Sequence, residues 1–236
     1  MGYMVDGTHA EYVRTPFADN SLYPLPEALN QEVAVFLSDV LPTAHEIGVQ
    51  YGNVKPGDSI AIVGTGPIGM GCLLTAQFYS PSQIIAVDMD DNRLALAKEL
   101  GATDTINSAK EDAVEKILAL TGSRGVDCTM EAVGAEATWN ICQNVVKEGR
   151  HIANVGVYGK AVNFELNKLW IKNLTITTGL VNANTTGMLL KSCCSGKLPL
   201  ERLATHHFKF DEFEKACDVF KHAADENAMK VMIDIA

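Results

Sequence analysis

The sequence has 236 residues, of which 47% are hydrophobic, and carries a formal net charge of −10 with a pI near 5.0. This composition suffices for one large domain or for a domain with an appendage, and the acidic balance argues against nucleic acid or an anionic membrane as a partner. No apolar run is long enough to cross a bilayer, and the first residues lack the basic and apolar regions of a signal peptide, so we expect a cytoplasmic protein.

The amino-terminal segment, residues 1–28, carries turn signals and short alternating runs. This pattern predicts strands and loops of a β-rich unit. Such a short segment cannot bury a sheet alone, so we expect it to pair with the other end of the chain or with residues outside this sequence. Residues 27–51 show helical spacing of apolar side chains, interrupted at Asp39 and Pro42, which predicts a kinked pair of helices.

A strand, a glycine-rich turn and a helix follow. Residues 59–63 form a short β-branched run typical of a strand buried on both faces, and a helical pattern extends from Pro67 to about Tyr79. In the pattern G-x-G-x-x-G between them, the first glycine permits the turn, the second lets the backbone approach a pyrophosphate, and the third lets helix and strand pack closely. The helix N-terminus supplies N–H groups for the phosphates. The predicted phosphate-binding residues are Gly64, Thr65, Gly66, Pro67, Ile68 and Gly69.

A second apolar run, residues 84–88, ends in Asp88, which lies 19 residues beyond Gly69. A carboxylate at this place accepts hydrogen bonds from the adenosine ribose of a dinucleotide. It also repels the extra phosphate of NADP, so NAD is the favoured cofactor. Arg93, five residues further on, lies near enough to the adenosine end to leave some tolerance for NADP.

In the rest of the chain, stretches with the pattern of a strand alternate with stretches that have the apolar spacing of a helix. Strands are predicted at 103–106, 126–134, 151–156 and 174–180, and helices at 91–100, 109–120 and 136–146. This alternation predicts an α/β fold with a doubly wound parallel sheet of the Rossmann type, which binds ligands beyond the carboxyl ends of its strands. The tail is predicted to contain helices at 186–195 and 211–223, a short run at 206–210 and a strand at 230–235, which could pair with the amino-terminal strands.

These motifs, in this order and spacing, resemble the zinc-dependent medium-chain alcohol dehydrogenases over essentially the whole chain. The nearest resemblance is to the secondary-alcohol branch, in which an aspartate replaces one cysteine ligand of the catalytic zinc. The resemblance implies a partial GroES-like catalytic domain at 1–28, an NAD-binding domain at 29–180 and a return to the catalytic domain at 181–236. The segments that carry it are Gly2–Arg14, Ser38–Thr43, Lys55–Asp58, Gly64–Gly69, Glu131–Gly134 and Val155–Val157.

The resemblance also implies roles for individual residues. Asp39 would bind zinc, Thr43 would lie near the nicotinamide ring, and Val133 would line the adenine-ribose pocket. Backbone groups at the ends of the last two predicted strands would contact the nicotinamide amide; these residues are Val155, Gly156, Val157 and Thr178. The implied substrate is a small secondary alcohol or ketone, and the implied assembly is a homo-oligomer, a dimer or a tetramer.

The zinc site is expected to be incomplete in this sequence. In the family, a cysteine and a histidine that complete the site belong to a segment that precedes the first residue here, and a catalytic zinc needs three protein ligands. Asp39 also has a simpler interpretation as a helix-breaking acid, but we favour the metal because burying an unpartnered carboxylate is costly. The other candidates lack metal-ligand spacing, and the six cysteines show no C-x-x-C pattern, so we expect surface or packing roles for them. These candidates are His9, His45, His151, His206, His207, Cys193 and Cys194.

Three functions are therefore compatible with the sequence. The first is an NAD-dependent alcohol dehydrogenase of the zinc type, or a truncated form of one. The second is a catalytically inactive NAD-binding module. The third is a zinc-free reductase of the quinone type, which is disfavoured because those relatives do not require an acid at Asp39.

Overall fold

The computed structural model describes residues 4–27 and 29–235. Their contacts divide the chain into two compact units. The larger unit is Val35–Ser192, and the smaller unit combines Met1–Ala34 with Cys193–Ala236. The assignment of the flanking segments to a catalytic domain remains a prediction.

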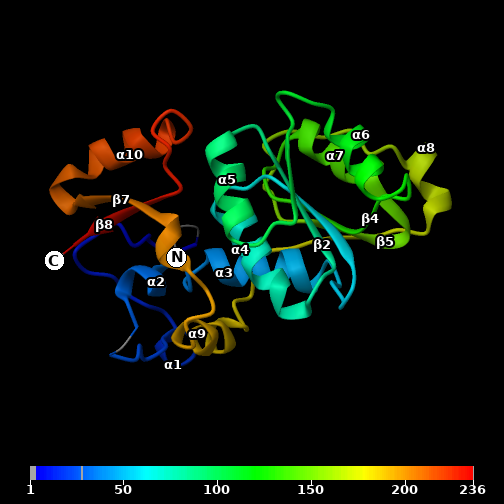
Figure 1. The fold of residues 1–236 in the computed structure, drawn as a ribbon. Helices are drawn as coiled ribbons and strands as arrows, with labels where there is room; N and C mark the ends of the chain where they lie inside the picture. Colours follow the sequence, from blue (N-terminus) through cyan, green and yellow to red (C-terminus); the bar gives the residue numbers. More distant parts are fainter. Residues whose placement is uncertain (1–3, 28, 236) are drawn as a thin grey trace. The chain divides into compact units, whose positions relative to one another are not determined.

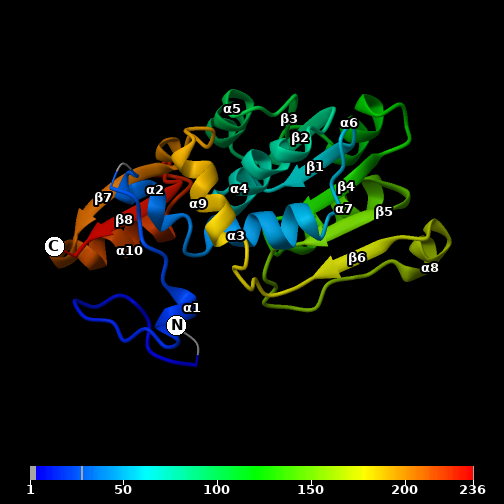
Figure 2. The same ribbon diagram turned by 90° about the horizontal axis from the view of Figure 1, so that it is seen from below.

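The larger unit is built on a six-stranded sheet with the order β3-β2-β1-β4-β5-β6, in which all neighbours pair in parallel. This confirms the predicted doubly wound parallel sheet. The strand order reverses between β1 and β4, and right-handed crossovers then place the helices of the two halves on opposite faces. Helices flank the sheet in Figures 1 and 2. The strands are β1 (Ser59–Val63), β2 (Gln83–Asp88), β3 (Asp104–Asn107), β4 (Val126–Glu131), β5 (Val146–Asn154) and β6 (Thr175–Thr178).

The helices of this unit fall into two groups by their contacts. One group packs α4 against α3 and the π-helix η1, and the other packs α6 against α7. The bounds are α3 (Val40–Thr43), η1 (Ala44–Gln50), α4 (Pro67–Ala76), the 3₁₀ turn η2 (Gln77–Tyr79), α5 (Asp91–Glu99), α6 (Ala113–Leu120), α7 (Glu136–Val145), α8 (Leu166–Leu169) and η3 (Trp170–Lys172).

The smaller unit contains a two-stranded parallel sheet of β7 and β8. Its elements are α1 (Ala18–Ser21), α2 (Gln31–Val35), η4 (Leu200–Leu203), β7 (Ala204–Lys209), η5 (Phe210–Glu212), α10 (Phe213–Lys221) and β8 (Lys230–Asp234). Helices α2 and α9 (Thr186–Cys194) run across the boundary between the units.

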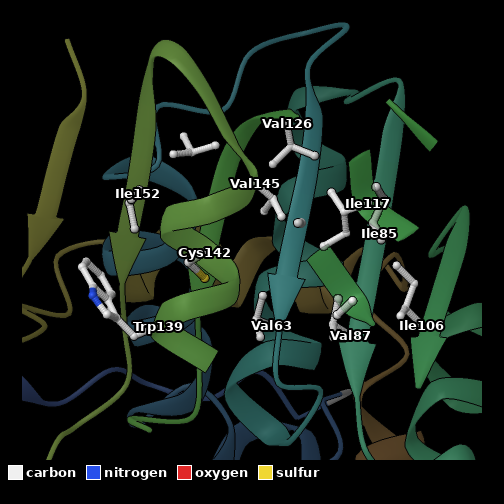
Figure 3. Close-up of a cluster of buried hydrophobic side chains, with 13 residues drawn as sticks. Val63, Ile85, Val87, Ile106, Ile117, Val126, Trp139, Cys142, Val145 and Ile152 are labelled. Atoms are coloured by element: carbon white, nitrogen blue, oxygen red, sulfur yellow. The ribbon is translucent and has the colours of Figure 1, made fainter. Parts of the chain in front are cut away.

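The sheet holds its shape through burial on both faces. All five residues of β1 are buried. One face forms a hydrophobic cluster with α6 and α7, in which Ile117, Cys142 and Val145 are fully buried against the strands (Figure 3). Ile117 and Val145 each contribute roughly 1.5–3 kcal/mol when they leave water. This packing fixes the strands, and with them the turns at their carboxyl ends.

The predicted strands of the amino-terminal segment are wrong. Residues 4–27 contain no strand, and α1 is their one regular element. Nearly all of these residues are exposed, and none of them joins β7 and β8 in the two-stranded sheet, so their backbone lacks the partner strand that a strand needs. Gly2 and Tyr3 lie outside the described residues.

Of the two interruptions predicted in residues 27–51, the one at Asp39 is confirmed and the one at Pro42 is wrong. The helical pattern breaks at residues 36–39, and α3 then continues through Pro42 into η1. Pro42 lies in the first turn of α3, where its missing N–H has no helical acceptor. A separate difference concerns β5, which begins at Val146 and not at His151 as predicted.

No helix in residues 4–27 and 29–235 combines the length and the apolar character needed to cross a membrane.

The core assignment can be tested on one helix. Ile117 is fully buried, whereas Leu120 at the end of the same helix is 43% exposed. We expect Ile117→Ala to lower the free energy of unfolding by about 2–5 kcal/mol because it leaves a cavity. Leu120→Ala is the matched control and should cost about 1 kcal/mol or less. Urea unfolding followed by tryptophan fluorescence measures both, and equal losses would contradict this core.

Candidate functional site

The glycine-rich turn between β1 and α4 has the geometry of a phosphate site. Gly64 has φ +98, and a Cβ on it would lie 2.4 Å from Cγ2 of Val133. A Cβ on Gly69 would lie 1.8 Å from the carbonyl oxygen of Gly64, so only glycine lets α4 approach the turn this closely. Around Gly66 there is open space, because the nearest atom to its added Cβ is Nη1 of Arg93 at 3.9 Å. Among the described residues no side chain caps α4, whose first N–H groups are left for an anion.

Asp88, the last residue of β2, is fixed against this turn. Its Oδ2 accepts hydrogen bonds from the backbone N–H of Thr65 at 2.7 Å and from the Thr65 hydroxyl at 2.9 Å. Its Oδ1 accepts from the N–H groups of Met89 at 2.8 Å and Asp90 at 3.1 Å. The carboxylate is thus held half-buried at the carboxyl edge of the sheet, with its negative charge beside the turn.

Arg93 brings a positive charge to the same place. It lies in the first turn of α5, where Asp90 caps the helix and accepts from the Arg93 N–H at 3.3 Å. Its guanidinium approaches Gly66, in the middle of the turn, more closely than the sequence indicated. A guanidinium in this position suits a phosphate oxygen as well as an adenosine group.

A second carboxylate, Glu131 at the end of β4, organises the next two loops. It is fully buried and accepts from the N–H groups of Val133 at 3.0 Å and Gly134 at 2.9 Å, and from the Thr138 hydroxyl at 2.6 Å. Its backbone carbonyl accepts from the N–H of Gly156 at 2.9 Å, so the residue joins the loop after β4 to the loop after β5.

The space between these two loops is small. A Cβ on Gly156 would lie 2.2 Å from Oε2 of Glu131 and 2.3 Å from the nitrogen of Gly134. Tyr158 follows in the same loop, and burial together with the Glu131 carboxylate raises its pKa, so the phenol stays protonated.

The structure places most predicted cofactor residues along this one edge of the sheet. Val133 is 51% exposed and Val157 is 89% exposed, both after the carboxyl ends of β4 and β5. Thr178 ends β6 and lies 3.5 Å, oxygen to nitrogen, from the side-chain amide of Asn154. That amide also donates to the carbonyl of Gly156 at 3.1 Å. The edge therefore presents the ends of β1, β2, β4, β5 and β6 in one row.

Asp39 precedes α3 and Thr43 is its last residue, in the group of helices that packs α3 and η1 against α4. Thr43 donates from its hydroxyl to Oδ1 of Asp39 at 2.6 Å, and Ala44, the next residue, packs so closely that a Cβ on Gly71 of α4 would lie 2.8 Å from it. Asp39 is exposed and precedes α3, so the premise that its carboxylate is buried in a helix stripe is wrong. Its role as a zinc ligand stays a prediction.

The donor set for a metal is not complete in this part of the chain. In residues 4–27 and 29–235 there is no group of three or more His, Cys, Asp or Glu side chains that could hold an ion. The lone histidines and Cys193–Cys194 accordingly form no site with Asp39 in these residues.

His45 is the most unusual of the histidines. It is 1% exposed, and within the described chain neither ring nitrogen has a hydrogen-bond partner. Its ring stacks on Tyr79 with centroids 5.9 Å apart and meets the edge of Phe78 at 5.8 Å. Burial lowers its pKa, partly offset by the neighbouring carboxylate of Glu46. The ring is therefore held neutral in the folded protein.

Sequence reasoning missed the role of Glu131 and of Asn154. The signal for Glu131 was present, because an acid at the end of a buried strand followed by a glycine-containing turn is the same pattern that identified Asp88. The role of Asn154 has no such signal, since it depends on which strand lies beside β5.

The chain is similar to known dehydrogenases. A family model described as zinc-binding dehydrogenase matches residues 67–191. The alcohol dehydrogenase of Cupriavidus necator is 33% identical over 236 residues, covering 98% of this chain and 64% of that protein. The NADP-dependent isopropanol dehydrogenase of Entamoeba histolytica is 31% identical, covering 92% of this chain and 61% of that protein. The solved structure of zinc dependent alcohol dehydrogenase 2 from Streptococcus pneumonia has a TM-score of 0.93 at 52% identity, covering 98% of this chain and 67% of that one. The chain thus spans 64% and 61% of the length of the two curated relatives.

The glycine turn yields a paired prediction. Gly69→Ala forces a Cβ onto the Gly64 carbonyl, so we expect it to lower the free energy of unfolding by roughly 1–3 kcal/mol or more. Gly66→Ala meets open space at an allowed φ of −68, so it should stay within about 1 kcal/mol of wild type. Chemical denaturation of the two variants measures the difference. A larger loss for Gly66→Ala would show that this turn is wrong.

His45 yields a prediction about pH. Because its folded pKa is lower than its usual value of 6.5, the neutral ring contributes stability above pH 6.5, and that contribution is lost as the pH falls from there through the lowered pKa. The variant His45→Phe, which cannot titrate, should lose less stability on acidification than wild type. Unfolding free energies from pH 7.5 to 5 measure these slopes, and an unchanged slope in His45→Phe would contradict the burial of a neutral ring.

Proposed function

The chain belongs to the zinc-binding dehydrogenase family, and we propose that it is an NAD-dependent alcohol dehydrogenase of the zinc type, or a truncated form of one. The proposed reaction transfers a hydride between a small secondary alcohol or its ketone and nicotinamide. The name of the Entamoeba histolytica relative, an isopropanol dehydrogenase, supports this substrate class. A cytoplasmic location is part of the proposal.

One observation carries the choice of cofactor. Asp88 is held against the glycine-rich turn by two hydrogen bonds from Thr65, so its charge cannot swing away from the turn. A carboxylate at this point faces the ribose hydroxyls of NAD and repels the phosphate that NADP carries there. NAD is therefore the proposed cofactor, although the relative from Entamoeba histolytica is described as NADP-dependent.

The residues present fit a dinucleotide. The turn at Gly64–Gly69 and the N-terminus of α4 would hold the pyrophosphate, with Arg93 beside it, and Asp88 would hold the ribose. Val133 would line the adenosine side, and the backbone of Val155–Val157 with Thr178 would orient the nicotinamide amide. Bound NAD supplies hydride transfer at the nicotinamide ring. Glu131 keeps the two loops between these groups in place through its hydrogen bonds.

The residues present do not by themselves fit a catalytic zinc. Asp39 offers one carboxylate, bonded to Thr43, whereas a catalytic site needs three protein ligands. In the family reaction Asp39 is proposed as a ligand and Thr43 as a neighbour of the nicotinamide.

A homo-oligomer is also proposed. β6 pairs only with β5 within the described residues, so one of its edges is open. Large apolar side chains are exposed before and after it: Trp170 is 68% exposed, Ile171 63% and Leu180 89%. An open strand edge with apolar flanks suits pairing with a second copy of the chain.

The cofactor choice is tested by titrating the purified chain with NAD and with NADP. We expect NAD to bind at least about tenfold more tightly, since like charges in contact cost several kcal/mol. Asp88→Asn should reduce this preference by about tenfold or more. Asp91→Asn removes one charge at the start of α5, three residues beyond Asp88 and at an exposed position, and should leave the preference unchanged. A wild-type preference for NADP, or an equal effect of both variants, would refute the role of Asp88.

The same sample separates the enzyme from an inactive module. Stoichiometric zinc with turnover of isopropanol or acetone supports the dehydrogenase. NAD binding with neither zinc nor turnover supports the module, and turnover that survives a chelator supports a zinc-free reductase.

A further inference from the structure

A groove lies at the amino ends of the strands, opposite the edge that carries the glycine-rich turn. Its volume is about 720 Å³, and a neighbouring hollow of about 440 Å³ shares three of its lining residues, Arg124, Asp127 and Lys147. We call the two together the amino-edge groove. Its charged lining residues are Arg124, Asp127, Lys147, Glu148, Arg150 and Lys172. Four cations and two carboxylates therefore meet in one groove of a chain whose net charge is −10.

Asp127 fixes two of these cations. Its carboxylate is 10% exposed and lies 2.9 Å from Nζ of Lys147 and 3.1 Å from Nε of Arg150. It also accepts from the N–H and the hydroxyl of Ser59, both at 2.9 Å. Burial by itself would raise the pKa of Asp127, but the hydrogen bonds from Ser59 and Lys147 outweigh burial and hold the pKa below its usual range. The carboxylate is therefore ionised, and Lys147 and Arg150 balance its negative charge within the groove wall.

The other two cations are not neutralised in this way. Arg124 is exposed in the loop before β4, and Lys172 reaches the carbonyl of Val146 at 3.4 Å from η3. In the part of the chain that the structure describes, neither forms an ion pair. Glu148 is the one carboxylate of the lining besides Asp127. The groove thus keeps a positive surplus on side chains from separate elements.

We propose that the amino-edge groove binds a small molecule that carries a phosphate group. Guanidinium and ammonium groups are the side chains that bind phosphate by charge-assisted hydrogen bonds. Ser123 and Asn144 line the same groove and add a hydroxyl and an amide for the rest of such a ligand. The volume suits a small ligand, and the strongly acidic chain disfavours a long polyanion such as nucleic acid. This site is independent of the cofactor edge and of the proposed dehydrogenase activity.

The test uses inorganic pyrophosphate as the probe, measured by calorimetry on the full chain. The variant Arg124→Gln with Lys172→Gln removes both unneutralised cations. Lys191→Gln with Lys221→Gln is the matched control, because it removes two exposed cations that line neither the groove nor the carboxyl edge and changes the net charge equally. Arg93→Gln is measured separately, because Arg93 lies beside the glycine-rich turn where the pyrophosphate of the cofactor is proposed to bind. Circular dichroism and a thermal scan establish that each variant is folded; Arg124 is exposed, and Lys172 is half-buried and outside the hydrophobic cluster.

We expect pyrophosphate to bind wild type and the control variant with equal affinity. We expect its affinity for the groove variant to be lower by about tenfold or more. Three results would overturn the proposal: no binding of millimolar pyrophosphate to folded wild type, loss in Arg93→Gln with retention in the groove variant, or an equal loss in the groove variant and the control variant. The second result would place pyrophosphate at the glycine-rich turn. Because the readout needs neither NAD nor turnover, its failure is distinct from failure of the proposed function.

Discussion

The contact between Asp88 and Thr65 is the interaction on which the carboxyl edge depends. It joins the end of β2 to the turn that follows β1 by two hydrogen bonds to a single carboxylate oxygen. The Gly64 N–H adds a bond to the Val87 carbonyl at 2.8 Å, so the turn continues the pairing of β1 with β2 beyond the last strand residue. A turn fixed in this way has its N–H groups oriented before any ligand arrives, which saves the free energy of ordering a loop on binding.

The same turn is bounded on its other side by the loop after β4. In the sheet order, β1 lies between β2 and β4, and each of these neighbours ends in an acid, Asp88 or Glu131. Glu131 bonds its own loop and Val133 of that loop lies against Gly64. The two carboxylates therefore have the same structural role: each lies at the end of a parallel strand and fixes a loop by accepting hydrogen bonds from its backbone N–H groups. Their charges differ in exposure, because Asp88 is half-buried at the surface of the site and Glu131 is fully buried behind it.

The sequence predicted well where burial on two faces dictates the pattern. The β-branched run of β1 and the glycine spacing before α4 have few structural solutions, and the observed bounds of both agree with the prediction. Prediction failed where the tertiary neighbours of a segment, and not its local sequence pattern, decide its structure. The alternating runs near the amino terminus look like strands, but no neighbouring strand satisfies them in residues 4–27. Pro42 looks like a break, but its effect depends on where the helix begins, and Asp39 rather than the proline precedes α3. The burial inferred for Asp39 failed for the same reason, since a residue in a turn leaves the apolar stripe.

Helix ends place partial charges of opposite sign at the two edges of the sheet. At the carboxyl edge the helix α4 begins, its N–H groups carry partial positive charge, and acids stabilise the turn around it. At the amino edge α6 and α7 end, at Leu120 and Val145, and their carbonyl groups carry partial negative charge. Cations near these ends are therefore expected on structural grounds alone, and Lys172 donates to the carbonyl of Val146, the residue that follows α7. That requirement does not account for Asp127, which places a buried carboxylate between Lys147 and Arg150 and holds both at the groove wall. A helix end needs one cation nearby, whereas the amino-edge groove has two cations without an ion pair in the described residues, Arg124 and Lys172, beside the two that Asp127 fixes. That surplus is what a site for a phosphate group requires.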